Sequence, residues 1–148
     1  MATAKGKLPS YLIVDAHSMI FAWDDLRELH NSSTIAARHE LIRRMTSYQD
    51  STAEHVVLVF DGKGETTRTN NEADGIQVFY SPSGITADQI IERLAGKYAN
   101  HRCLTVASRD RGVLDTCSAF GANAISARTL YELLERAKTE LSRRINTR

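Results

Sequence analysis

Short apolar runs alternate with segments of helical character along nearly the whole chain. Strands are predicted at 11–14, 56–60, 76–80, 103–107 and 122–125. Helices are predicted at 34–50, from 86 onward, at 111–120 and at 127–142. Strands that alternate with helices form parallel sheets with right-handed crossovers. The sequence therefore predicts an α/β fold, a three-layer α/β/α sandwich with a mainly parallel central sheet.

Length and composition favour one folded domain. The chain has 148 residues and is 42% hydrophobic, enough for one core. Residues 1–10 are polar and predict a disordered lead-in, residues 11–142 the domain, and residues 143–148 a basic C-terminal tail. The polar, glycine-containing stretch 62–75 predicts a loop. Both cysteines, Cys103 and Cys117, lack metal-finger spacing and are expected to be buried thiols.

The charge and hydropathy pattern excludes several classes of protein. No apolar stretch approaches the roughly 20 residues that span a bilayer, and the first residues lack a secretory signal, so we expect no membrane partner and a cytoplasmic location, or a plastid stroma after processing. The formal net charge is +1, so any nucleic-acid footprint must be local. No Gly-x-Gly-x-x-Gly fingerprint is present, and no nucleotide cofactor is expected.

Four aspartates stand where predicted strands end or where the next helix begins. Asp15 follows the first strand, Asp61 follows the second, and Asp110 follows the strand at 103–107. Asp88 lies in the first turn of a helix whose capping box starts at Thr86. Because parallel strands share one carboxyl edge, these acids are expected to converge there.

A group of carboxylates at one edge predicts a site for a divalent metal ion. Like charges packed together raise each other's pKa unless a cation offsets them, and a set of carboxylates alone suits Mg²⁺ or Mn²⁺. Glu92 lies on the same helix face as Asp88 and either joins the metal ligands or pairs with a surface cation. Asp15, Asp88 and Asp110 are the favoured ligands, and Asp61, directly before Gly62 in a turn, is the one expected to support the others.

The motifs around these acids resemble a known family. The segments are Tyr11 to Ile20 with Trp23, Val57 to Gly62, Val78 to Ser81, Thr86 to Glu92, Val106 to Asp110 and Ile125 to Leu130. Together they resemble the NYN domain of the YacP type, a group of the PIN-like nucleases, over roughly residues 12–137. By position, the acidic site residues of the family fall on Asp15, Asp61, Asp88 and Asp110.

The resemblance implies an activity. It implies a metal-dependent endoribonuclease with Mg²⁺ or Mn²⁺ as cofactor and RNA, either mRNA or rRNA, as partner. Members of the group are similar to a ribosome-associated endoribonuclease of bacteria and plastids, which implies the ribosome as a further partner. In such a site the metal polarises the phosphate and activates water, so no protein nucleophile is needed.

Polar and basic residues near the acids are the candidate substrate contacts. We expect Ser18 and Ser108 to orient water or phosphate, or else to act as ordinary caps at strand ends. The expected phosphate-binding cations, with a solvated loop as the alternative, are Lys63, Arg68, Arg109 and Arg111. Trp23 is expected to pack against the first helix rather than to stack on a base.

The chain departs from the family pattern after the first strand. The family usually has Asp-Gly-Tyr-Asn, whereas this chain has Asp15, Ala16, His17 and Ser18. This departure keeps open a second hypothesis, a nuclease-like fold retained as an inactive RNA- or ribosome-binding module. An aspartyl-nucleophile phosphatase is disfavoured, because it requires an acid at the position of His17. A receiver domain is disfavoured because its acidic pair and lysine are missing.

Overall fold

The computed structural model describes residues 10–62, 68–71, 75–100 and 103–146, with residues 68–71 described by their backbone alone. Within these residues the strands are β1 (Ser10–Asp15), β2 (His55–Phe60), β3 (Arg68–Asn71), β4 (Gln77–Tyr80), β5 (Cys103–Ala107) and β6 (Asn123–Ile125). They form one sheet in the order β3-β4-β2-β1-β5-β6. Neighbouring strands are parallel from β4 to β6, and β3 is antiparallel to β4. The predicted mainly parallel sheet is confirmed.

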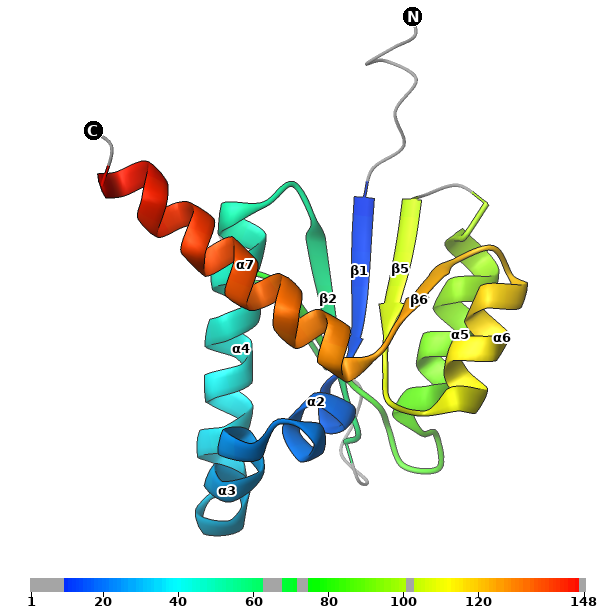
Figure 1. Cartoon of the computed structure of the whole chain (residues 1–148). Helices are drawn as coiled ribbons and strands as arrows, with labels where there is room; N and C mark the ends of the chain where they lie inside the picture. The colour runs from blue at the N-terminus through cyan, green and yellow to red at the C-terminus, as the bar shows by residue number, and fades with distance from the viewer. Residues whose placement is uncertain (1–9, 63–67, 72–74, 101–102, 147–148) are drawn as a thin grey trace, which may run out of the picture.

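Helices cover both faces of this sheet. They are α2 (Ala16–Ala22), α3 (Asp24–Ser32), α4 (Thr34–Ser51), α5 (Ala87–Tyr98), α6 (Arg111–Ala119) and α7 (Ala127–Asn146). Figure 1 shows α2, α3, α4 and α7 on one face and α5 and α6 on the other. Each face has its own cluster of buried apolar side chains, so the three-layer prediction is confirmed.

Three details differ from the sequence predictions. The stretch 62–75 was predicted as a loop, but β3 lies within it, because its polar backbone pairs with the edge of β4. The helix predicted to end at 142 continues as α7 to Asn146, so Arg143 and Arg144 belong to that helix. Cys117 is buried as expected, whereas Cys103, at the start of β5, is exposed.

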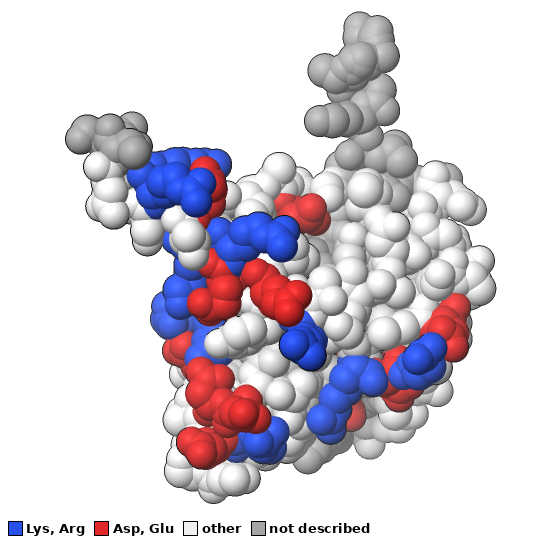
Figure 2. All heavy atoms as spheres, in the orientation of Figure 1, with Lys and Arg blue, Asp and Glu red and all other residues white. Residues whose placement is uncertain are grey.

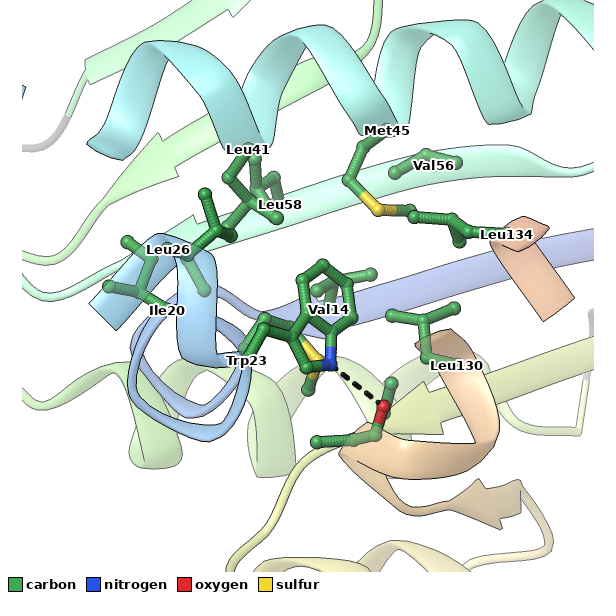
Figure 3. Packing of buried hydrophobic residues seen from close by; sticks show 14 of the residues in the cluster. Val14, Ile20, Trp23, Leu26, Leu41, Met45, Val56, Leu58, Leu130 and Leu134 are labelled. Atoms are coloured by element: carbon green, nitrogen blue, oxygen red, sulfur yellow. Dashed lines mark hydrogen bonds between the residues drawn. The ribbon is translucent and has the colours of Figure 1, made fainter. Parts of the chain in front are cut away.

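Trp23 fixes the helices that follow the first strand. Its ring is 5% exposed in the core on the α4 side, and its indole Nε1 donates a hydrogen bond of 3.1 Å to the carbonyl oxygen of Ala127 (Figure 3). This bond satisfies a buried donor and connects the α2–α3 junction to the start of α7. The packing role expected for Trp23 is confirmed.

The surface is uneven in charge. Figure 2 shows acidic and basic side chains intermixed over α4 and α7, while much of the rest of this view carries few charges. In the described residues no helix is long and apolar enough to cross a membrane.

Candidate functional site at the carboxyl edge of the sheet

The four strand-end aspartates line one cavity of about 430 Å³. Asp15 ends β1, Asp61 follows β2, and Asp110 caps the start of α6. Asp88 lies in the first turn of α5. Because β1 lies between β2 and β5 in the parallel sheet, their carboxyl ends meet at this edge. The structure therefore brings together acids that are up to 95 residues apart in the sequence.

Asp15 is the most buried of these acids, and two serines hold it. Asp15 is only 5% exposed. Its Oδ2 accepts hydrogen bonds from Ser18 Oγ at 2.8 Å and from Ser108 Oγ at 2.9 Å. Hydroxyl donors stabilise the ionised carboxylate without neutralising its charge. Ser18 stands where the family pattern has asparagine, and it supplies a polar contact to the first aspartate.

The same serines set the loop between β5 and α6. Ser18 Oγ accepts a hydrogen bond from the backbone N–H of Arg109 at 3.1 Å, and Ser108 Oγ accepts one from that of Asp110 at 3.0 Å. The carboxylate of Asp110 accepts from the N–H of Val113 at 3.2 Å and so caps α6. Both serines were predicted as substrate contacts or strand-end caps. In the structure their hydroxyls face Asp15 and this loop.

Asp61 is held by a serine that the sequence analysis missed. Ser81 Oγ donates to Asp61 Oδ1 at 3.1 Å and accepts from the N–H of Gly62 at 3.0 Å. Ser81 is fully buried. Gly62 is required here, because a Cβ at this position would lie 2.0 Å from the Ser81 carbonyl oxygen. The only sequence signal for Ser81 was its place between a predicted strand and Pro82.

Asp88 carries the clearest electrostatic signal of the site. The capping box of Thr86 and Gln89 is formed, and it places Asp88 in the first turn of α5 beside the cavity. Burial, followed by the charges of Asp15, Asp110, Glu92 and Asp61, raises the pKa of Asp88 from 3.8 to about 6. The helix dipole at this position favours the ionised form. Burial and the neighbouring acids act in the opposite direction.

The remaining predicted residues have different positions. Arg109 lines the cavity, with its guanidinium carbon 5.9 Å from the centre of the Phe21 ring. Glu92 contributes charge to Asp88 but does not line the cavity. Arg111 is exposed in the first turn of α6, also outside the lining. Lys63 and the side chain of Arg68 lie outside the described part of the chain.

Four further lining residues were not predicted as site residues. They are His17, Phe21, Thr86 and Ala87. The ring of His17 packs edge-on against Phe21, with centroids 6.1 Å apart. His17 follows directly on the Asp15 and Ala16 pair, and this closeness in sequence was the available signal. Phe21 gave no such signal, because an aromatic residue one turn further along a helix is ordinary core patterning.

The donor set of the cavity fits a hard divalent cation in its chemistry. Its acidic lining consists of aspartates, with Arg109 as the one Lys or Arg among the described lining residues. In the described part of the chain, however, no three His, Cys, Asp or Glu side chains stand close enough to hold one ion. The aspartates therefore surround the cavity, but their carboxylates do not converge on one position.

A parallel α/β sheet with acids gathered at its carboxyl edge is the arrangement expected for a PIN-like nuclease. The YacP-like NYN domain family matches residues 12–148. A curated relative, described as the uncharacterized protein YacP of Bacillus subtilis (strain 168), is 35% identical over 141 residues, covering 90% of this chain and 80% of the relative.

Solved structures give the same result. The crystal structure of a mutant of Rae1 (YacP) from Bacillus subtilis matches with a TM-score of 0.80 and 32% identity, covering 93% of this chain and 82% of that one. A second crystal structure of Rae1 (YacP) matches with a TM-score of 0.78 and 30% identity, over 93% and 80% of the two chains. This chain belongs to the YacP-like NYN domain family.

Proposed function

We propose that this protein is a metal-dependent endoribonuclease that hydrolyses RNA phosphodiester bonds at the carboxyl edge of the sheet. The observation that carries the proposal is the group of four aspartates around one cavity, with the pKa of Asp88 raised to about 6 by burial and by the other acids. A site that holds ionised acids together without a matching number of cations is suited to bind a cation from solution. Membership of a nuclease-like family supports the same reading.

Asp15, Asp88 and Asp110 would supply the ligands, and their side chains would have to draw closer around the ion, because no three acids of the described residues stand close enough to hold one. Carboxylate ligands favour Mg²⁺ or Mn²⁺. When bound, the ion supplies positive charge at the phosphate and a water of lowered pKa. Ser18 and Ser108 fix the orientation of Asp15 by donating to its Oδ2. Asp61, held by Ser81, adds negative charge at the edge of the cavity. These contacts keep the ligands oriented before substrate arrives.

Arg109 is placed to bind the substrate phosphate. It is exposed, it lines the cavity, and its guanidinium lies over the face of Phe21. A planar guanidinium presents several N–H donors that match phosphate oxygens. We expect it to orient the phosphate beside the acids and to offset charge that develops during cleavage.

The resemblance on which this proposal rests also favours mRNA on the ribosome as the substrate, and the cytoplasm or a plastid stroma as the location. Cleavage of an mRNA by the purified protein with and without ribosomes separates this finer proposal from the general one. Equal rates in both conditions would exclude a requirement for the ribosome.

The test of the nuclease assignment is cleavage of labelled single-stranded RNA by three proteins, namely wild type, Asp88→Asn and Asp115→Asn. Asp115 is an exposed acid on α6 outside the cavity, so its variant is the matched control. With Mg²⁺ or Mn²⁺ we expect Asp88→Asn to cleave about 100-fold more slowly than wild type, since it loses one of the carboxylates that would hold the cation. The control should match wild type, and a chelator should stop cleavage.

Two outcomes would contradict the assignment. Cleavage by Asp88→Asn at the wild-type rate would separate the activity from the acids. RNA binding without cleavage by the wild-type protein would favour the second hypothesis, an inactive binding module.

A further inference from the structure

A row of aromatic rings leads away from the acidic cavity toward α4. The rings of the aromatic row are those of Phe21, His17, Phe60 and Tyr80. Phe21 and His17 meet edge-on at 6.1 Å, and His17 and Phe60 at 6.2 Å. Phe60 and Tyr80, paired across β2 and β4, stack with centroids 5.2 Å apart and an interplanar angle of 14°. The row thus connects a wall of the cavity to the surface beside α4.

An arginine lies over each end of the aromatic row. Arg109 stands over Phe21 at the cavity end. At the other end, Arg38 of α4 places its guanidinium carbon 5.4 Å from the centre of Phe60 and 5.9 Å from that of Tyr80. Stacking on rings holds a guanidinium in a fixed orientation without using its N–H donors.

Arg38 differs from the other arginines of its helix. Arg43 and Arg44, one to two turns later on α4, pair with Glu40. Arg38 has no carboxylate within salt-bridge distance among the described residues, and its buried Nε has no hydrogen-bond partner there. The buried Nε is out of reach of a ligand from solution, but no hydrogen bond or ion pair among the described residues uses the terminal N–H groups of Arg38, so these are available to a ligand.

We propose that Arg38 is a substrate-positioning residue that binds a backbone phosphate of single-stranded RNA away from the scissile bond. This inference rests on the proposed nuclease function and adds a second contact point to it. Arg109 binds the RNA at the cavity, and Arg38, at the far end of the aromatic row, binds the part of the RNA that extends away from the cavity. The two guanidiniums therefore set the path of the RNA past the carboxyl ends of β2 and β4.

The chemistry at Arg38 matches an anion with two oxygens better than a neutral ligand, because a guanidinium binds such a group bidentately. On the proposed nuclease function, that group is a phosphodiester of the RNA backbone. A contact at this distance contributes to RNA affinity without touching the reacting atoms.

The experiment measures binding of fluorescent single-stranded RNA by anisotropy, with a chelator present so that cleavage does not interfere. The full chain is compared as wild type, Arg38→Met, Arg38→Lys and Arg43→Met. Met keeps the apolar stem over the rings, and Arg43 is an exposed, ion-paired arginine of the same helix, so Arg43→Met controls for loss of one positive charge. Thermal unfolding of each variant reports whether packing has changed.

We expect Arg38→Met to bind RNA about tenfold more weakly than wild type, because one charged hydrogen-bonded contact is lost. The slope of log affinity against log salt should fall by about 0.7, the value for one phosphate of a single strand. Arg38→Lys should keep the slope but bind more weakly than wild type, since it loses the fork. Arg43→Met should match wild type, and in cleavage Arg38→Met should raise KM while leaving kcat unchanged.

Equal affinity and equal salt slope for Arg38→Met and Arg43→Met would overturn the inference. If Arg38→Met is unstable, the same comparison is made with Arg38→Lys, and wild-type affinity in that variant would equally overturn the bidentate contact. Failure of the nuclease assignment is separate: a wild-type protein that binds RNA through Arg38 but never cleaves it would overturn the proposed catalysis and leave this contact in place.

Discussion

Two groups of carboxylates in the described part of the chain have their charges balanced in different ways. On α3 and α4, Asp25 and Glu40 share the guanidiniums of Arg43 and Arg44, with Arg43 Nη2 2.7 Å from Glu40 Oε2 and Arg44 bonded to both acids. The hydrogen bond from Arg43 is the main cause of a pKa of about 2 for Glu40, and that from Arg44 lowers the pKa of Asp25. These acids need no further partner.

At the carboxyl edge of the sheet the hydrogen-bond partners of Asp15 and Asp61 are neutral serine hydroxyls. Hydroxyls of Ser18 and Ser108 hold Asp15, and the pKa of Asp88 rises to about 6. Serines orient a carboxylate but leave its charge in place, so repulsion among the acids persists. The comparison shows that the acids of α3 and α4 are paired with arginines, whereas the acids of the cavity, where we propose that a cation binds, have neutral hydrogen-bond partners.

Removing the hydroxyl of Ser108, a neutral hydrogen-bond partner of the cavity acids, should have the largest effect on stability. Ser108→Ala leaves the buried Asp15 and the N–H of Asp110 each without one partner. We expect the free energy of unfolding to fall by about 2 kcal/mol, the cost of leaving buried polar groups unsatisfied. Urea unfolding measures this, with Ser118→Ala on the exposed side of α6 as control. Equal values for the two variants would show that Ser108 does not support the site.

Neutralising one acid in each group should change stability in opposite directions. Asp88→Asn removes repulsion, so its free energy of unfolding at pH 7 should rise by about 1 kcal/mol, after allowance for solvent screening of a partly exposed group. Glu40→Gln removes a charge paired with Arg43 and Arg44, so stability should fall by about 1 kcal/mol or less. Urea unfolding of both variants at low salt measures the signs. A loss of stability in both would contradict the contrast between the groups.

The pH dependence of the free energy of unfolding should also differ between Asp88→Asn and Glu40→Gln. Because the folded-state pKa of Asp88 is raised, the ionised carboxylate lowers the free energy of unfolding above pH 6, and this loss disappears as the pH falls toward 3.8. The greater stability of Asp88→Asn over wild type should therefore vanish by about pH 4. The pKa of Glu40 is lowered from 4.5 to about 2, so its favourable contribution is present above 4.5 and is lost only as pH falls through about 2. At pH 5 the penalty of Glu40→Gln should therefore persist.

The backbone frame of the site could be predicted from the sequence because its signals are local. Apolar runs followed by aspartate mark strand ends, and the capping box at Thr86 places Asp88 in its helix. β3 could not be predicted in this way, because its polar residues pair with β4 without an alternating pattern of their own.

The supporting contacts could not be predicted because they join residues that are far apart in the sequence. Ser81 reaches Asp61 across 20 positions, and Arg38 meets Phe60 only because α4 packs beside β2. Nothing next to Arg38 in the sequence distinguishes it from Arg43. Such residues become visible only when the partners of each charge are known from the fold.

The acids of α3 and α4 are paired with arginines, and we propose that the acids of the cavity instead bind a divalent cation from solution. Manganese binding, followed by the electron paramagnetic resonance signal of free Mn²⁺, tests this claim on wild type, Asp88→Asn and Glu40→Gln. We predict that wild type and Glu40→Gln bind Mn²⁺ equally, and that Asp88→Asn binds it at least about tenfold more weakly. Absence of binding by wild type, or equal binding by Asp88→Asn, would contradict the claim.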